Sequence, residues 1–199
     1  MPRGREGTMN AHEVRRDGEG VRRLTAGPVL DVLFVILATP ALVVIGLLAE
    51  AGRLPGLGRG GTPVAETLPV WGGVVLGAWM ALVAVVALVL PLVALAIWGG
   101  NADVRRALAP YVLVLICQIL VEATLARVFF SNIVVIVGLS YTIYRIWRLR
   151  LVRRDFAGAT VPGRYGRTVV DAILTLGLVS WSANLVFLLF VALPHVLRA

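Results

Sequence analysis

The stretch that decides the fold is "LICQILVEATLARVFFSNIVVIVG", which spans Leu115–Gly138. It lies within a longer segment, Pro110–Leu149, that is apolar apart from a few polar side chains, among them Glu122 and Arg127. Forty residues in one straight α-helix would extend about 60 Å, which is twice the roughly 30 Å of a bilayer's hydrocarbon core. We therefore expect two helices in this segment, joined by a tight turn near Phe130–Asn132.

The composition of the whole chain is that of a membrane protein. Of its 199 residues 59% are apolar and the mean hydropathy is +0.89, whereas soluble domains contain roughly 45–50% apolar residues. Further runs long enough to cross a bilayer are Pro28–Glu50, Val70–Trp98 and Val169–Leu197. The sequence predicts an all-α, polytopic membrane helical bundle with five transmembrane helices, with four helices as the alternative.

The positions of the arginines favour five helices over four. All 19 basic residues are arginine, and cytoplasmic loops of membrane proteins carry an excess of positive charge. With five helices and a cytoplasmic N-terminus, 15 of the 19 lie on the inner side, and the outer side keeps Arg53, Arg59, Arg127 and Arg198. With four helices this bias disappears. The sequence thus predicts a multi-pass protein of the cell (inner) membrane with its N-terminus in the cytoplasm.

The chain divides into a tail and one membrane domain. Residues 1–27 are polar and glycine-rich without helical periodicity, which predicts a disordered, basic cytoplasmic tail. Residues 28–199 are expected to form a single transmembrane helical bundle domain. Pro40 predicts a kink in the first span, Pro91 predicts a tilt or bend in the second, and Asn101 is a candidate N-cap of the third helix.

Two polar residues are predicted to lie deep in the membrane. Gln118 and Glu122 are four residues apart and hence share a helix face, at depths of about 12 Å and 18 Å. A charge at the bilayer centre costs about 2.5–3.5 kcal/mol, so this face should point into the bundle. Matching depths on the neighbouring helices adds four polar residues at the same level: Ser140, Tyr141, Ser182 and Asn184. This layer is either a proton- or ligand-binding site or a set of interhelical hydrogen bonds that fix the packing.

A second group of candidate residues lies in "YTIYRIWRLRLVRRDF", Tyr141–Phe156. Its aromatic and basic side chains predict a belt at the inner membrane interface. The candidate lipid-binding or partner-binding residues of this belt are Arg145, Trp147, Arg148, Arg150, Arg153 and Arg154. The belt is either an orientation anchor or a recognition site for an anionic lipid head group or an acidic partner protein. Asp31 and Asp171 are each expected in the first turn of a helix that starts on the cytoplasmic side, where the helix dipole and nearby arginines stabilise an acid.

The sequence carries no recognisable catalytic constellation. It contains no Cys-x-x-Cys, His-Glu-x-x-His or Gly-x-Ser-x-Gly motif and no glycine-rich phosphate loop. The single cysteine, Cys117, lies in an apolar run, and the histidines His12 and His195 lie near opposite ends of the chain. We therefore expect no enzymatic activity, no metal site and no cofactor.

Short motifs in the second half of the chain resemble a known family. Ala109-Pro110-Tyr111-Val112, followed by Gln118 and Glu122, resembles a pattern in a family of small uncharacterised transmembrane proteins from plants and cyanobacteria. The closing "WSANLVFLLFVALPHVLR", residues 181–198, is similar to that family's last segment. The resemblance implies a multi-helix membrane protein and supplies no catalytic residues.

These observations lead to one expected role and two alternatives. We expect a non-enzymatic accessory or scaffold subunit of a membrane complex, whose partners are the lipid bilayer, anionic lipid head groups and another membrane protein, and not nucleic acid. The first alternative is a small transporter or ligand-binding membrane protein that uses the intramembrane polar layer around Glu122. The second is a lipid-modifying enzyme.

Overall fold

The structure, a computed structural model, describes residues 11–54, 70–129 and 133–198. Within these ranges every regular element is a helix, which confirms the predicted all-α class. The helical elements are α1 (Ala11–Glu50), α3 (Val70–Ala84), η1 (Val85–Val89), α4 (Leu90–Trp98), α5 (Ala102–Val128), α6 (Ile133–Phe156), α7 (Gly166–Phe187), η2 (Leu188–Ala192) and α8 (Leu193–Arg198). The elements η1 and η2 are π-helical turns inside longer helices.

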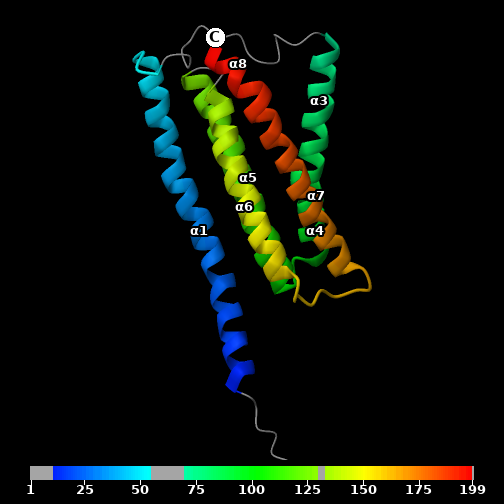
Figure 1. Cartoon of the computed structure of the whole chain (residues 1–199). Coiled ribbons are helices and arrows are strands. Elements are labelled where there is room, and N and C mark those ends of the chain that lie inside the picture. The colour runs from blue at the N-terminus through cyan, green and yellow to red at the C-terminus, as the bar shows by residue number, and fades with distance from the viewer. Residues whose placement is uncertain (1–10, 55–69, 130–132, 199) are drawn as a thin grey trace, which may run out of the picture.

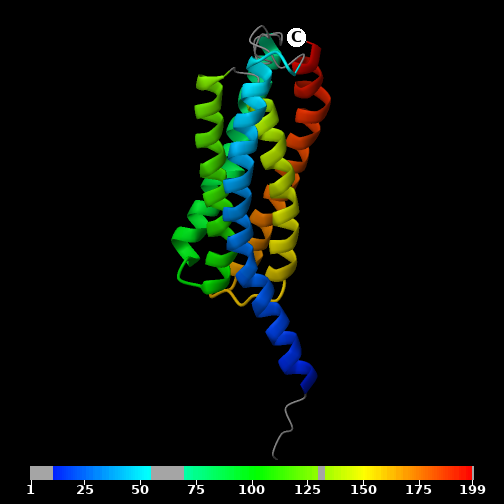
Figure 2. The same ribbon diagram turned by 90° about the vertical axis from the view of Figure 1, so that its left-hand side faces the viewer.

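Five helical rods result from this part of the chain, because α3, η1 and α4 are continuous, as are α7, η2 and α8. The rods lie side by side and alternate in direction (Figure 1). The N-terminal end of α1 and the C-terminal end of α8 consequently lie at opposite ends of the bundle (Figures 1 and 2).

The apolar segment at 110–149 does form two helices. α5 ends at Val128 and α6 begins at Ile133, and the two pack against each other along the bundle. The turn expected near 130–132 lies outside the described residues. Asn101 caps α5 as predicted: its side-chain oxygen accepts hydrogen bonds from the backbone N–H groups of Asp103 at 3.0 Å and Val104 at 3.1 Å.

The first helix is longer than the predicted span. α1 begins at Ala11, so residues 11–27 of the segment expected to be a tail continue the helix, and its first turns project beyond the other rods (Figure 2). Extending an existing helix costs little compared with nucleating one, which accounts for the continuation from the apolar part. Pro28 and Pro40 both lie inside this uninterrupted helix.

The two π-helical turns share a sequence signature. η1 is followed by Leu90-Pro91 and η2 by Leu193-Pro194. A proline inside a helix lacks an N–H group and its ring clashes with the carbonyl four residues earlier. A widened turn just before the proline relieves this clash, so the bend expected at Pro91 takes the form of a π turn.

Four helices are long and apolar enough to cross a membrane within the described residues: Pro28–Glu50, Gly72–Trp98, Ala102–Val128 and Gly166–Leu197. α6 is not among them, because five of its 24 residues are arginine. α6 nevertheless lies inside the bundle, in contact with α1, α5, α7, η2 and α8. The helix with the most arginines is therefore one that other helices surround.

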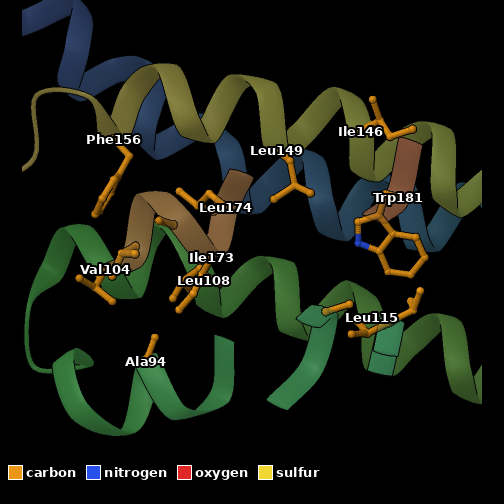
Figure 3. Packing of buried hydrophobic residues seen from close by; sticks show 14 residues of the cluster. Ala94, Val104, Leu108, Leu115, Ile146, Leu149, Phe156, Ile173, Leu174 and Trp181 are labelled. Carbon is orange, nitrogen blue, oxygen red and sulfur yellow. The ribbon is translucent and has the colours of Figure 1, made fainter. Parts of the chain in front are cut away.

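Two hydrophobic clusters hold the rods together. The first joins the α3–η1–α4 rod, α5, α6 and α7, and Figure 3 shows its side chains meeting between the helices, among them Leu108 of α5, Leu149 of α6 and Leu174 of α7. The second joins α1, α5, α6 and the η2–α8 end of the last rod, around Tyr141 and Ile133.

Candidate functional site

A cavity of about 370 Å³ lies between the α3–η1 rod, α5, α6 and the α7–η2 rod. Its walls are mostly apolar and include Met80, Val83, Leu115, Ile119 and Leu188. Its polar members are Gln118, Glu122, Trp181 and Asn184. A cleft or cavity of roughly 300–1,000 Å³ with apolar walls and a few convergent polar groups is typical of small-molecule sites, and this one is partly open at the surface of the bundle, where Met80 and Ile119 are exposed.

Gln118 and Glu122 form the polar wall of this cavity. The Nε2 amide of Gln118 donates a hydrogen bond to Oε1 of Glu122, as the spacing of four residues on one helix allows. Gln118 is 6% exposed, and its Oε1 atom has no hydrogen-bond partner among the described residues. A buried acceptor without a donor costs about 1–3 kcal/mol.

Glu122 faces α6 where that helix has no side chain. A Cβ placed on Gly138 would stand 3.7 Å from Oε1 of Glu122 and 3.6 Å from Cδ1 of Leu188. The backbone of α6 therefore lies alongside the carboxyl group. Gly138 was not singled out from the sequence, because a glycine is common in membrane helices.

Asn184 connects the cavity to α6. Its Nδ2 atom donates to Oγ1 of Thr142 at 3.2 Å, and Thr142 is fully buried. Sequence reasoning missed Thr142, although the depth argument that selected Ser140 and Tyr141 applies equally to this neighbour.

The three remaining residues of the predicted polar layer lie elsewhere. Ser140 donates to the carbonyl of Ile136 at 3.0 Å and Ser182 to the carbonyl of Leu178 at 2.8 Å, so both hydroxyls are satisfied within their own helices. Tyr141 is fully buried on another face of α6, with its ring 5.1 Å from that of Phe34 of α1 in an edge-to-face arrangement. The structure thus brings together Gln118, Glu122 and Asn184.

Both π-helical turns contribute to the cavity wall. Ala87 and Leu88 come from η1, and Leu188 and Ala192 come from η2. π-helical turns are rare in proteins, and those that do occur are often found at functional sites. Their convergence on one cavity is an observation independent of the polar residues.

Arg145 lies inside the bundle and not on its surface. It is 1% exposed, and its Cζ atom stands 4.2 Å from the ring centroid of Trp181, a distance at which a cation and an aromatic face attract. The Nε1–H of Trp181 in turn donates to the hydroxyl of Tyr111 at 2.9 Å. None of the three guanidinium nitrogens has a hydrogen-bond partner in the described part of the chain.

Arg148 also points inward, toward α1. Its Nε and Nη2 atoms donate to the two carboxylate oxygens of Asp31 at 2.7 and 2.8 Å, and the hydroxyl of Tyr144 donates to Oδ1 of Asp31 at 2.5 Å. The ring of Phe34 stacks on that of Tyr144 with centroids 3.8 Å apart. These contacts attach α1 to α6.

The two aspartates have partners, but not the predicted helix position. Asp31 lies well inside α1, because that helix begins at Ala11, and Asp171 follows the first turn of α7. The helix-dipole explanation is therefore wrong for both. The expected pairing with arginine is found for Asp31, and for Asp171, which accepts from Nε of Arg153 at 3.2 Å.

The rest of the predicted belt is on the surface of α6. Trp147 is 45% exposed, and Arg150, Arg153 and Arg154 are exposed as well. The structure thus divides the belt into two inward-facing arginines and four outward-facing residues.

A comparison with known protein families identifies the family of this chain. Residues 25–199 match a family described as a domain of unknown function, DUF7733. The chain belongs to this family. The DUF7733 match includes every residue that lines the cavity, so the cavity lies within the family's domain. No curated protein and no solved structure matches the chain.

Proposed function

We propose that this DUF7733 protein is a five-span protein of the inner membrane that binds a small apolar molecule carrying a hydrogen-bond donor. The observation that carries the proposal is the apolar cavity, which is lined by the carboxyl group of Glu122, a hydrogen-bond acceptor held in place by Gln118. This is the ligand-binding alternative of the sequence analysis, narrowed to three of its six polar residues.

The membrane arrangement rests on the alternation of the rods and on charge. The end of the bundle where α5 begins holds Arg105 and Arg106, the last three arginines of α6 (Arg150, Arg153 and Arg154), and Arg164 and Arg167. The opposite end holds Arg53 and Arg127. Positive charge is enriched on the cytoplasmic side, which supports a cytoplasmic N-terminus. With 24 residues, α6 extends about 36 Å, enough to cross the hydrocarbon core.

The hydrogen-bond capacity that remains on Glu122 indicates the ligand's chemistry. One N–H of the Gln118 amide is used by Glu122, and one N–H of the Asn184 amide is used by Thr142. A carboxylate accepts several hydrogen bonds, so Glu122 has acceptor capacity left for a ligand that supplies a hydroxyl or amine donor. The apolar walls accept the rest of the molecule, which would enter from the lipid phase.

Binding accounts for the site better than the other two roles. In a purely structural polar layer the predicted residues would bond across helices. Asn184 does so, to Thr142, but the two serines bond within their own helices and Gln118 bonds within α5. Glu122 is the one titratable side chain among the described residues that line the cavity. A single acid without a second catalytic group supports binding more than catalysis.

A matched pair of probes tests the proposal. In purified protein in lipid nanodiscs, 4-hexylphenol should bind about 5–10-fold more tightly than hexylbenzene, because only the phenol donates a hydrogen bond. The difference should disappear in Glu122→Leu. Equal binding of the two probes by the unaltered protein would contradict the role of the acceptors.

Two alanines of the same helix separate cavity binding from general partitioning. Ala84 lines the cavity and Ala81 does not, and both are exposed on α3. Ala84→Phe should weaken phenol binding at least about fivefold by occupying the cavity, and Ala81→Phe should leave it unchanged. If neither change affects binding, and the protein copurifies with a stoichiometric membrane partner, the accessory-subunit role replaces the proposal.

A further inference from the structure

Three arginines at the end of α6 share a groove with the neighbouring helix. Arg150, Arg153 and Arg154 line a groove of about 410 Å³ together with Leu178 of α7. Their spacing of three and four residues places them on one face of the helix. This groove lies apart from the cavity that contains Glu122, since the two have no lining residue in common.

The arginines of this groove differ from the rest of the belt in their pairing. Arg145 is buried over Trp181, and Arg148 is held by Asp31. Arg153 shares its charge with Asp171 at 3.2 Å. Arg150 and Arg154 are exposed and make no hydrogen bond or ion pair with any residue that the structure describes. The groove therefore presents two uncompensated guanidinium groups.

The polarity of the groove changes along the bundle. Asp171, which pairs with Arg153, lies near the start of α7, and Leu178 lies seven residues, or about 10 Å, further along that helix. Charged side chains thus stand near the end of the bundle and an apolar wall continues toward its middle. A phospholipid has the same order of a charged head group and then an acyl chain.

We infer that this groove is a specific site for an anionic phospholipid with two phosphate groups. Arg150 and Arg154 each bind one phosphate, because the planar guanidinium group donates two parallel hydrogen bonds to phosphate oxygens. The two arginines stand one helical turn apart, about 6 Å along the axis, and an acyl chain lies against Leu178. This inference rests on the inner-side orientation proposed above and not on the cavity.

A second arginine pair provides the control. Arg105 and Arg106 are also exposed, lie at the same end of the bundle and belong to α5, outside the groove. Replacing either pair removes two positive charges from the same membrane interface. A diffuse attraction to anionic lipid responds equally to both replacements, whereas a built site responds to one.

The experiment is a lipid titration of the full chain in detergent micelles, followed by native mass spectrometry. The probes are tetraoleoyl cardiolipin, dioleoyl phosphatidylglycerol and dioleoyl phosphatidylcholine. The unaltered protein should bind one cardiolipin at least about tenfold more tightly than phosphatidylglycerol. The double variant Arg150→Gln/Arg154→Gln should lose about tenfold in cardiolipin affinity, and Arg105→Gln/Arg106→Gln less than about twofold.

Equal losses in the two double variants would overturn the inference, as would equal affinities for the two anionic lipids. Should the groove variant fail to fold, the single variants Arg150→Gln and Arg154→Gln are each expected to lose about threefold. If the unaltered protein binds cardiolipin as expected but does not bind 4-hexylphenol, only the cavity proposal is refuted.

Discussion

In a soluble protein the apolar part of α1 would be buried and the arginine-rich helix α6 would lie on the surface, and here the two positions are exchanged. The apolar part of α1 lies at the side of the bundle, and many of its large side chains are exposed, such as Val29, Ile36, Leu37 and Leu47. α6 carries five arginines, yet ten of its 24 residues are buried and other helices surround it. Apolar side chains outside and polar ones inside is the arrangement that a lipid solvent favours. A hydropathy criterion therefore detects a helix whose surface faces lipid, such as α1, and misses a helix that other helices surround, such as α6.

The strongest test of this comparison is whether α6 crosses the membrane. In a Cys117→Ala background, we expect Arg53→Cys to react with a membrane-impermeant thiol reagent added outside cells. Gly158→Cys should react only after the membrane is opened, because α6 returns the chain to the cytoplasmic side. Both positions are exposed in loops. Labelling of both from outside would show that α6 does not cross and that the chain has four spans.

The attachment of α1 to α6 should have the largest effect on stability. Asp31→Ala leaves Arg148 largely buried without its carboxylate, and we expect the free energy of unfolding to fall by about 3 kcal/mol. Thermal unfolding in nanodiscs measures the change. Asp171→Ala breaks the exposed pair with Arg153 and should cost less than about 1 kcal/mol. Similar costs for both would mean that α1 is held by apolar packing alone.

Replacing the buried arginine of α6 is expected to change the free energy of unfolding in the opposite direction. Arg145→Met removes a cation whose nitrogens lack hydrogen-bond partners within the described residues, and we expect the free energy of unfolding to rise by about 1 kcal/mol. The lost interaction with Trp181 offsets part of this gain. Arg150→Met, on the surface, should change stability by less than about 0.5 kcal/mol. A large destabilisation by Arg145→Met would reveal a polar partner of Arg145.

The smallest expected effect concerns the hydrogen bond between α6 and α7. Thr142→Val keeps the shape of the side chain and removes the acceptor of the Asn184 amide, which should cost about 0.6 kcal/mol. Ser182→Ala removes a hydroxyl that bonds within its own helix and should be close to neutral by the same unfolding measurement. A larger loss in Ser182→Ala than in Thr142→Val would reverse this assignment.

Length and spacing predicted the main features of the fold and part of the site. The 110–149 segment had to fold back because it is too long for one span, and Gln118 and Glu122 had to share a face because they are four residues apart. Both expectations match the structure. The pairing across helices was harder, since a hydroxyl at a given depth can bond its own helix instead, as Ser140 and Ser182 do.

Which way each arginine of α6 points was beyond the reach of sequence reasoning. Arg145 and Arg148 resemble Arg150 and Arg154 in type and setting, and only the neighbours in space separate them: Trp181 for one and Asp31 for the other. The π turns, in contrast, had a signal in the sequence. A Leu-Pro pair late in a long apolar run precedes the end of both rods, and a proline removes one N–H group from the regular hydrogen-bond ladder.

The π turns also set the angular phase of the helices that leave the cavity. Each widened turn accommodates one additional residue, which rotates everything after it by about 100° relative to an uninterrupted α-helix. Ala94 in α4 and Val196 in α8, both buried, owe their inward orientation to that rotation. Removing a single residue from η1 or η2 would leave a regular α-helix in which these side chains keep their orientation, and the π turn in the cavity wall would be lost.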